Sequence, residues 1–237
     1  MYSPAADLGV RRTNRSIDSI TVMPQILQLK VALRRIRPPI WRRLEVSADA
    51  SLFELHHILQ AAMGWTDSHL HLFEQNGVYY GAPDREFGMP MVSERRTRIG
   101  ELLPAARARL VYEYDFGDSW EHDVVVEAVG EAQSEARYPR VTAGKRACPP
   151  EDVGGTFGYI EFLEAIADPT HDDHARMLEW LGGPFDPERF DVVSANDRLP
   201  RRRRTARRPR RGRRPGRPCR QNRGSEASRR GVARAAA

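Results

Sequence analysis

A regular alternation of apolar and polar residues near the start of the chain most restricts its fold. Every second position of this segment is apolar: Leu27, Leu29, Val31 and Leu33. The period of two is typical of a β-strand with one buried face. Such a strand buries its apolar face against a covering layer, so other elements of the chain must pack on it.

The signals that follow alternate between strands and helices. Residues 40–46 predict a second strand after Pro38-Pro39, and Asn76-Gly77 predicts a hairpin that joins residues 69–75 to residues 78–80. Ser51 and Glu54 have capping-box spacing and predict a helix from residue 52 to a cap at Gly64. Strands are expected at 109–114 and 122–129. Helices are expected at 99–103, 159–167 and 172–181, with a last one beginning near residue 186. Residues 81–108 are interpreted as a long connection, and residues 130–146 as irregular.

Composition divides the chain into three parts. Residues 1–23 lack periodicity and are expected to form a flexible lead-in, and residues 24–199 are expected to form a single domain. Residues 201–237 contain sixteen arginines and one acid, Glu226, a charge of +15 against +6 for the whole chain. The rest of the chain therefore has a net charge of −9, which argues against nucleic-acid binding by the folded part. Residues 200–237 are expected to be disordered, as a polycationic arm for nucleic acid or as an incidental extension.

The cysteines and the apolar runs indicate the compartment. The chain has two cysteines, Cys148 and Cys219, which predicts a reducing environment without a disulfide framework. No uninterrupted apolar run approaches the roughly 20 residues that span a bilayer. We therefore expect a cytoplasmic protein with no membrane partner.

Residues 114–122, Tyr-Asp-Phe-Gly-Asp-Ser-Trp-Glu-His, combine aromatic rings and carboxylates around one glycine. Together with a glycine-rich loop at 147–159, they predict a pocket with aromatic walls and acidic groups. The residues predicted to line it are Trp65, Tyr114, Asp115, Phe116, Asp118, Trp120, Glu151, Asp152 and Tyr159. The first functional hypothesis is a binding module, whose acids select a cationic or hydrogen-bonding group of a protein or small-molecule partner.

The second hypothesis is a hydrolase or nuclease that uses a divalent metal ion to activate water. Its candidate ligands are His69, His71, Asp115, Asp118 and His122, with Glu151 or Asp152 as a further candidate. The alternative is structural: the two aspartates cap a turn, His122 pairs with one of them, Trp120 fills the core, and His69 and His71 are solvated. His56 lies on the apolar stripe of its predicted helix, where we expect a buried, hydrogen-bonded histidine or, alternatively, a catalytic or metal-binding one.

Several short segments together resemble the plasmid pRiA4b ORF-3-like family over about residues 26–199. These are Pro-Ile-Trp-Arg at 39–42, Leu-His at 55–56, Gly-Trp at 64–65, His-Leu-His at 69–71, residues 114–122, Ala-Cys-Pro-Pro-Glu-Asp at 147–152, Gly-Gly at 154–155, Gly-Tyr at 158–159 and Phe-Asp-Pro at 185–187. The resemblance implies a single roll-like α+β domain, with a mostly antiparallel sheet packed by helices. It also implies an association with mobile elements, because members are also labelled insertion-element passenger or resolvase-like proteins. It implies no established activity and leaves open whether the protein is an enzyme.

The chain departs from the family pattern at two positions. Val141 and Val153 stand where members often have cysteines, so a thiolate metal site that uses those positions cannot operate here and Cys148 remains alone. The residues also show no serine- or tyrosine-recombinase pattern, so the resolvase label has no support in this sequence.

Overall fold

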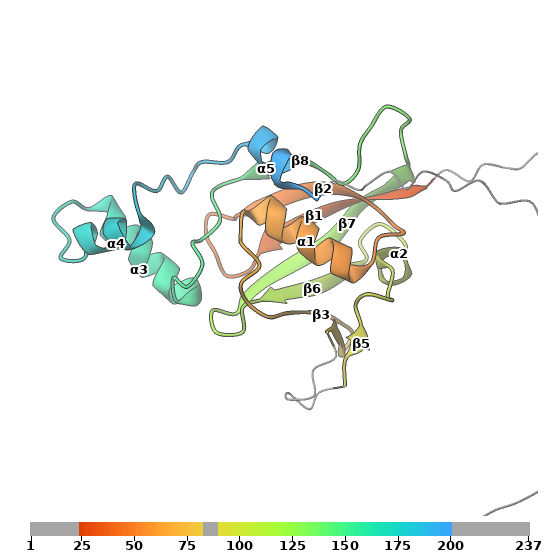
Figure 1. Ribbon diagram of the computed structural model, residues 1–237, viewed down its shortest axis with the longest axis horizontal. Coiled ribbons are helices and arrows are strands. Elements are labelled where there is room, and N and C mark those ends of the chain that lie inside the picture. The colour runs from red at the N-terminus through yellow and green to blue at the C-terminus, as the bar shows by residue number, and fades with distance from the viewer. Residues whose placement is uncertain (1–23, 83–89, 201–237) are drawn as a thin grey trace, which may run out of the picture. The chain divides into compact units, whose positions relative to one another are not determined.

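The computed structural model describes residues 24–82 and 90–200 (Figure 1). Within them, eight strands form one sheet and five helices accompany it. The strands are β1 (Gln25–Leu33), β2 (Trp41–Ser47), β3 (His71–Gln75), β4 (Val78–Gly81), β5 (Val92–Ser93), β6 (Arg109–Tyr114), β7 (Trp120–Glu131) and β8 (Arg140–Lys145). The helices are α1 (Leu52–Met63), α2 (Ile99–Leu102), α3 (Gly155–Ala167), α4 (His174–Leu181) and α5 (Val192–Arg198).

The sheet confirms the predicted α+β class. Its strand order is β5-β4-β3-β6-β7-β1-β2-β8, and every neighbouring pair is antiparallel except β4 and β5. The predicted lead-in at 1–23 and the arginine-rich segment from residue 201 lie outside the described residues, as do residues 83–89 of the predicted connection. The predicted hairpin joins β3 to β4, and Asn76 and Gly77 both have positive φ, at 53° and 80°, as a tight hairpin turn requires.

Helix α1 lies across one face of the sheet (Figure 1). The predicted capping box is present, because the Glu54 amide donates to the Ser51 hydroxyl and the Ser51 amide donates to the Glu54 carboxylate. The helix ends at Gly64, which has a φ of 102° and is therefore in the left-handed region. The buried side of α1 carries Leu55 and Leu59, together with one histidine, His56.

A row of aromatic rings lies on the sheet face beneath α1. Side chains that are directly opposite in an antiparallel pair point to the same face, and the register pairs Phe73 with Tyr112 and Tyr112 with His122. Since the Tyr112 hydroxyl contacts His56 of α1, this shared face is the one that α1 covers. The same register places Tyr114 and Trp120 opposite each other.

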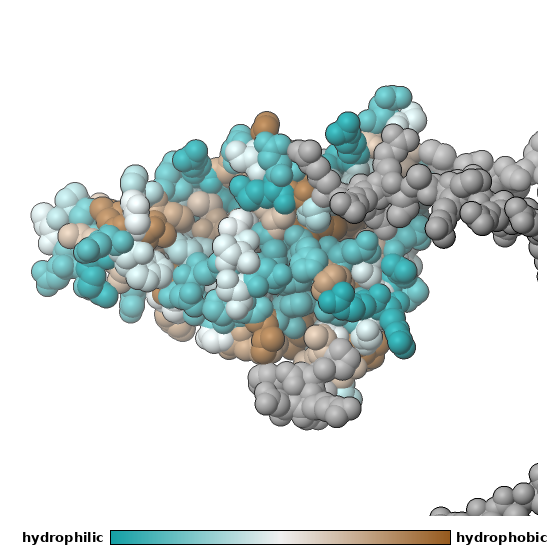
Figure 2. Space-filling model, viewed as in Figure 1, coloured by the Kyte–Doolittle hydropathy of each residue, from teal (hydrophilic) through white to brown (hydrophobic). Residues whose placement is uncertain are grey.

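Helices α3 and α4 pack against each other beside the sheet (Figure 1). They bury Tyr159 and Phe162 but leave large apolar side chains exposed, and Figure 2 shows apolar surface over this pair. The exposed residues include Phe157, Ile160 and Trp180. None of the five described helices has the length and apolar composition needed to cross a membrane.

Three elements differ from the sequence-based expectations, and the first is β5, which lies in the segment interpreted as a long connection. Residues 140–145, predicted to be irregular, form β8 at the sheet edge, where Val141 alone is fully buried, so no alternation marked the strand. The last helix begins at Val192 instead of near residue 186. Asp191 caps it by accepting from the Ser194 amide at 2.7 Å, whereas Asp186 accepts from the Glu188 amide in the preceding turn.

Candidate functional site

Two stacked imidazoles lie between α1 and β3. The rings of His56 and His71 have centroids 3.4 Å apart and planes within 4° of parallel. Each ring is held by a carboxylate: His56 Nε2 lies 2.7 Å from Asp67 Oδ1, and His71 Nε2 lies 2.8 Å from Glu94 Oε2. Glu94 is only 2% exposed, so its carboxylate is buried together with the imidazole. The predicted buried, hydrogen-bonded histidine at position 56 is confirmed.

The hydrogen bonds around His56 define its protonation state. Gln60 Oε1 accepts from the Asp67 amide at 3.1 Å, so its Nε2 is the atom that donates to the Tyr112 hydroxyl, at 2.9 Å. Tyr112 then donates its own proton to His56 Nδ1, and His56 Nε2 donates to Asp67. Every donor in this chain has an acceptor when His56 is neutral. Burial, and then the neighbouring His71, lower the pKa of His56 to about 4, which agrees with this assignment.

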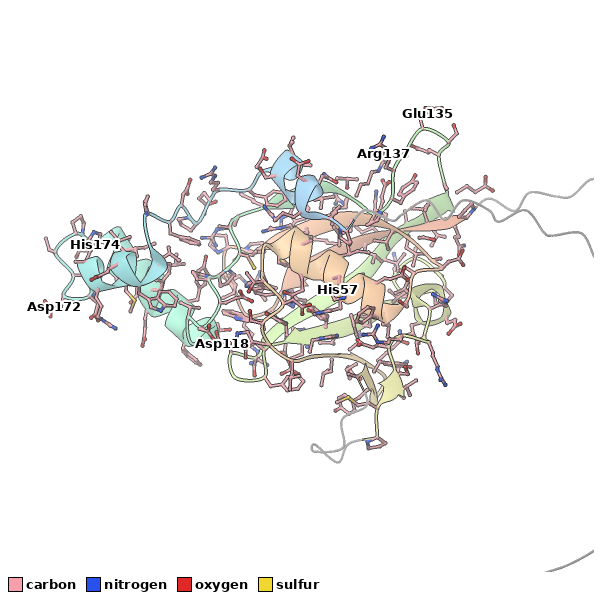
Figure 3. All side chains as sticks on the ribbon, viewed as in Figure 1. His57, Asp118, Glu135, Arg137, Asp172 and His174 are labelled. Atoms are coloured by element: carbon pink, nitrogen blue, oxygen red, sulfur yellow. The ribbon has the colours of Figure 1, made fainter. Side chains whose placement is uncertain are left out.

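The stacked rings help to line a cavity of about 280 Å³. Asp67 and Glu94 are acidic groups in its lining, and Phe53 and Phe116 contribute aromatic wall. The other lining residues are His56, His57, His69, Leu70, His71, Ala82, Met91 and Arg95. Figure 3 shows His57 on α1. The cavity thus combines apolar walls with a small number of fixed polar groups, as ligand-binding cavities do.

A second polar cluster surrounds His69, which also lines the cavity. His69 Nε2 lies 3.7 Å from Asp115 Oδ2 and 3.3 Å from Asp152 Oδ1, and the three atoms lie within 4.8 Å of one another. Within the described residues, His69 Nε2 has no hydrogen bond, although the atom is almost fully removed from solvent. Asp115 Oδ1 accepts from the Gly117 amide at 3.0 Å, which leaves Oδ2 facing the histidine.

The loop that carries Asp152 is tied to the turn that carries Asp115. The Gly154 amide donates to Asp118 Oδ2 at 3.3 Å, and a Cβ atom on Gly155 would lie 2.6 Å from the Asp118 backbone oxygen. Only glycine permits so close an approach at this position, where φ is also positive, at 67°. Figure 3 shows Asp118 in the turn beside the start of α3. The Asp118 carboxylate therefore helps to position the two loops.

Glu151 has a similar positioning role. Its carboxylate accepts from the Thr66 amide at 3.2 Å, from the Thr66 hydroxyl, and from the Tyr114 hydroxyl at 2.6 Å. The Ser68 amide in turn donates to the Tyr114 oxygen at 3.0 Å. Glu151 thus fixes the segment between α1 and β3, from which Asp67 and His69 reach the cavity.

Most of the aromatic residues predicted to wall the pocket belong to the core. Trp65, Tyr114, Trp120 and Tyr159 are each less than 9% exposed, belong to the hydrophobic core cluster and do not line the cavity. Trp65 Nε1 is satisfied by the Pro149 oxygen at 3.0 Å. Of the nine residues in the pocket prediction, Phe116 lines the cavity, while Asp115 and Asp152 lie in the cluster around His69.

The five residues predicted as metal ligands do not form a single cluster. The structure brings His69 and Asp115 together, but His71 pairs with Glu94 and Asp118 binds the neighbouring loop. His122 is fully buried beneath α1, where its Nδ1 donates to the Tyr112 backbone oxygen at 3.3 Å. Burial lowers the pKa of His122 to about 4, so its imidazole is neutral in the core.

The acidic residues and the arginine of the cavity lining were not found from the sequence. Glu94 lies in the segment interpreted as a connection, where no local pattern marks it, and Arg95 follows it. Asp67 could have been sought, because a histidine on a buried helix face requires a hydrogen-bond partner and His56 was placed on that face. The sequence offered no means of choosing Asp67 from the other acids.

The relatives of the chain match the folded region just described. Residues 25–194 match the family described as plasmid pRiA4b ORF-3-like protein. The chain is 40% identical over 176 residues to the uncharacterized protein y4hQ of Sinorhizobium fredii (strain NBRC 101917 / NGR234), which covers 74% of this chain and 88% of that protein. It is also similar to the crystal structure of the protein of unknown function MM3350 from Methanosarcina mazei Go1, with a TM-score of 0.67, 38% identity and coverage of 73% of this chain and 97% of that chain. The chain therefore belongs to the plasmid pRiA4b ORF-3-like family.

Proposed function

We propose that this protein is a binding module, acting as an accessory protein of a mobile element, whose cavity receives an organic cation. The cation is a guanidinium or ammonium group on a small molecule or on a partner's side chain. The observation that carries the proposal is the cavity lined by the stacked pair of His56 and His71, each held by a carboxylate. The mobile-element role is supported by the family's description as a plasmid protein.

The polar lining supports a role in recognition, because burying polar groups at this position lowers the stability of the fold. A buried carboxylate such as Glu94 loses its hydration, and apolar side chains of similar volume would pack at this position with less loss. The hydrogen bonds to His56 and His71 fix the orientation of both rings before any ligand arrives. A site fixed in advance loses less conformational entropy on binding, which favours affinity for a small partner.

The charged groups of the lining favour a cationic ligand. Asp67 and Glu94 line the cavity, His56 is neutral, and Arg95 is the single lysine or arginine among the lining residues. The Arg95 guanidinium lies 3.5 Å from the centroid of the Phe53 ring, so the cavity wall already accepts a planar cation against an aromatic face. An incoming cation would find the Asp67 carboxylate together with the aromatic ring of Phe116, which also lines the cavity.

The test is a titration of the ¹⁵N-labelled full-length protein with methylguanidinium, followed through amide chemical shifts. We expect saturable shifts in residues 53–57 and 67–71, which flank the cavity. The Asp67→Asn and Glu94→Gln variants each remove one negative charge from the lining, and we expect binding to weaken about tenfold, or roughly 1.4 kcal/mol. The matched control is Glu161→Gln on an exposed position of α3, which should bind like the native chain.

The same titration with methyl phosphate tests an anionic ligand in place of a cationic one. Saturable binding of methyl phosphate in the cavity, with no shifts on addition of methylguanidinium, would contradict the proposal. Equal affinity for methylguanidinium in Asp67→Asn, Glu94→Gln and Glu161→Gln would likewise show that the cavity acids do not recognise the cation.

A further inference from the structure

We infer that His69, Asp115 and Asp152 form a site for a divalent transition metal ion at the cavity. The three residues come from three separate segments: the approach to β3, the turn after β6, and the loop before α3. Their side-chain atoms converge although no hydrogen bond joins His69 to either carboxylate. This inference does not depend on the organic-cation proposal, since it concerns different ligand atoms and a different probe.

The distances in this cluster match those between ligands on a shared metal ion. For bonds of about 2.1 Å in a tetrahedral zinc site, neighbouring ligand atoms are about 3.4 Å apart. His69 Nε2 lies 3.3 Å from Asp152 Oδ1 and 3.7 Å from Asp115 Oδ2. A direct hydrogen bond would bring the atoms closer, as it does for His71 and Glu94 at 2.8 Å.

The state of His69 Nε2 is the second observation that points to a metal ion. This nitrogen has almost no contact with solvent and has no hydrogen bond within the described part of the chain. A buried nitrogen without a partner is costly, and a metal ion would satisfy it. The ion would also offset the repulsion between the two carboxylates that face the same nitrogen.

The second group with suitable residue types, His56, His57 and Asp67, is a poorer candidate. His56 Nε2 already donates to Asp67 at a hydrogen-bonding distance of 2.7 Å. If Nε2 bound a metal ion, Nδ1 would carry the proton and would donate to the Tyr112 hydroxyl. That hydroxyl already accepts from Gln60, so its own proton would lose the acceptor that it has now.

The surrounding hydrogen bonds support the ligands as they do in metal centres. Asp115 uses Oδ1 to accept from the Gly117 amide and keeps Oδ2 for the site, and Asp118 ties the two aspartate-bearing segments together through Gly154. One imidazole and two carboxylates suit Zn²⁺, Mn²⁺ or Fe²⁺. Three protein ligands leave a position open for water, which gives the metal-dependent hydrolase hypothesis a defined location.

The experiment is isothermal titration of the full-length protein with Zn²⁺, repeated on single variants. We expect one Zn²⁺ site per chain, weakened at least tenfold in His69→Gln and in Asp152→Asn. The Asp152 side chain is 72% exposed, so its amide variant should fold like the native chain. The control is Asp172→Asn, which Figure 3 places at the far end of the α3–α4 pair and which should leave zinc affinity unchanged.

A second readout identifies the nitrogen that binds the metal ion. In spectra of the ¹⁵N-labelled histidine side chains, Zn²⁺ should shift the His69 Nε2 resonance by more than any other histidine nitrogen. Three results would overturn the inference: no zinc binding at 100-fold molar excess of the ion, zinc affinity unchanged in both His69→Gln and Asp152→Asn, or zinc affinity lost in His57→Gln but retained in His69→Gln. The last result would move the site to the group around His56.

Discussion

Replacing His122 with phenylalanine should remove part of the acid sensitivity of folding. Burial lowers the pKa of His122 from 6.5 to about 4 in the native state. In the unfolded chain the imidazole regains its ordinary pKa, so between these values the unfolded state binds a proton that the native state excludes. The stability that the neutral ring contributes is therefore complete above pH 6.5 and is lost as the pH falls toward 4.

The size of the effect follows from the two pKa values. A gap of about 2.5 pH units, at 1.36 kcal/mol for each unit, makes the native state roughly 3 kcal/mol less stable at pH 4 and about 2 kcal/mol less stable at pH 5 than at high pH. Phenylalanine has a similar ring and removes the titration. At neutral pH it removes the hydrogen bond from His122 Nδ1 to the Tyr112 backbone oxygen, whereas His122 Nε2 has no hydrogen bond to lose within the described residues.

The assay is urea unfolding, followed by tryptophan fluorescence at pH 7, 6 and 5, for the native chain and for His122→Phe. The native chain should lose about 2 kcal/mol more than the variant between pH 7 and pH 5. His56, whose pKa is also lowered, contributes equally to both proteins and cancels in this difference. Equal losses for the two proteins would refute the reasoning, since they would show that the native imidazole titrates at its ordinary pKa.

Three further predictions concern other parts of the chain. Gly155→Ala should destabilise the fold by about 1–3 kcal/mol in thermal unfolding, because its Cβ would lie 2.6 Å from a backbone oxygen. The control is Gly182→Ala, which is also at positive φ but has no atom within 4 Å, so it should destabilise the fold less. Equal destabilisation by the two substitutions would contradict the close contact at Gly155. Burial raises the pKa of the Cys148 thiol to about 12, so little reactive thiolate forms at neutral pH. In a Cys219→Ser chain at pH 7.5, iodoacetamide should react with Cys148 roughly a hundredfold more slowly in the folded protein than after unfolding in urea. Equal rates would show that the thiol is accessible. Truncation after residue 200 should lower retention on DNA-cellulose and its dependence on salt, because it removes the +15 charge of the tail; unchanged retention would assign nucleic-acid binding elsewhere.

Local patterns predicted the elements that frame the site. The alternation in β1, the capping box of α1 and the Asn76-Gly77 turn depend on neighbouring residues, and all three occur in the structure as predicted. The same reasoning placed His56 on the buried face of α1. These features could be read from the sequence because helix and strand periods determine which residues share a face.

Contacts between segments far apart in the sequence determine the parts of the site that could not be predicted. Glu94 reaches His71 because β5 pairs with β4 after a long connection, and no local signal specifies that pairing. Alternation places Tyr112 and Tyr114 on one face, but it does not say that α1 covers that face, so the expected aromatic wall became part of the core. His122 is buried for the same reason.

The central claim is that the cavity over the stacked rings of His56 and His71 recognises a cation. A crystal structure of the full-length protein with methylguanidinium tests it most directly. We predict the guanidinium in this cavity, within hydrogen-bonding distance of the Asp67 carboxylate. An empty cavity in crystals that bind methylguanidinium elsewhere, or a guanidinium in contact with neither Asp67 nor Glu94, would contradict the claim.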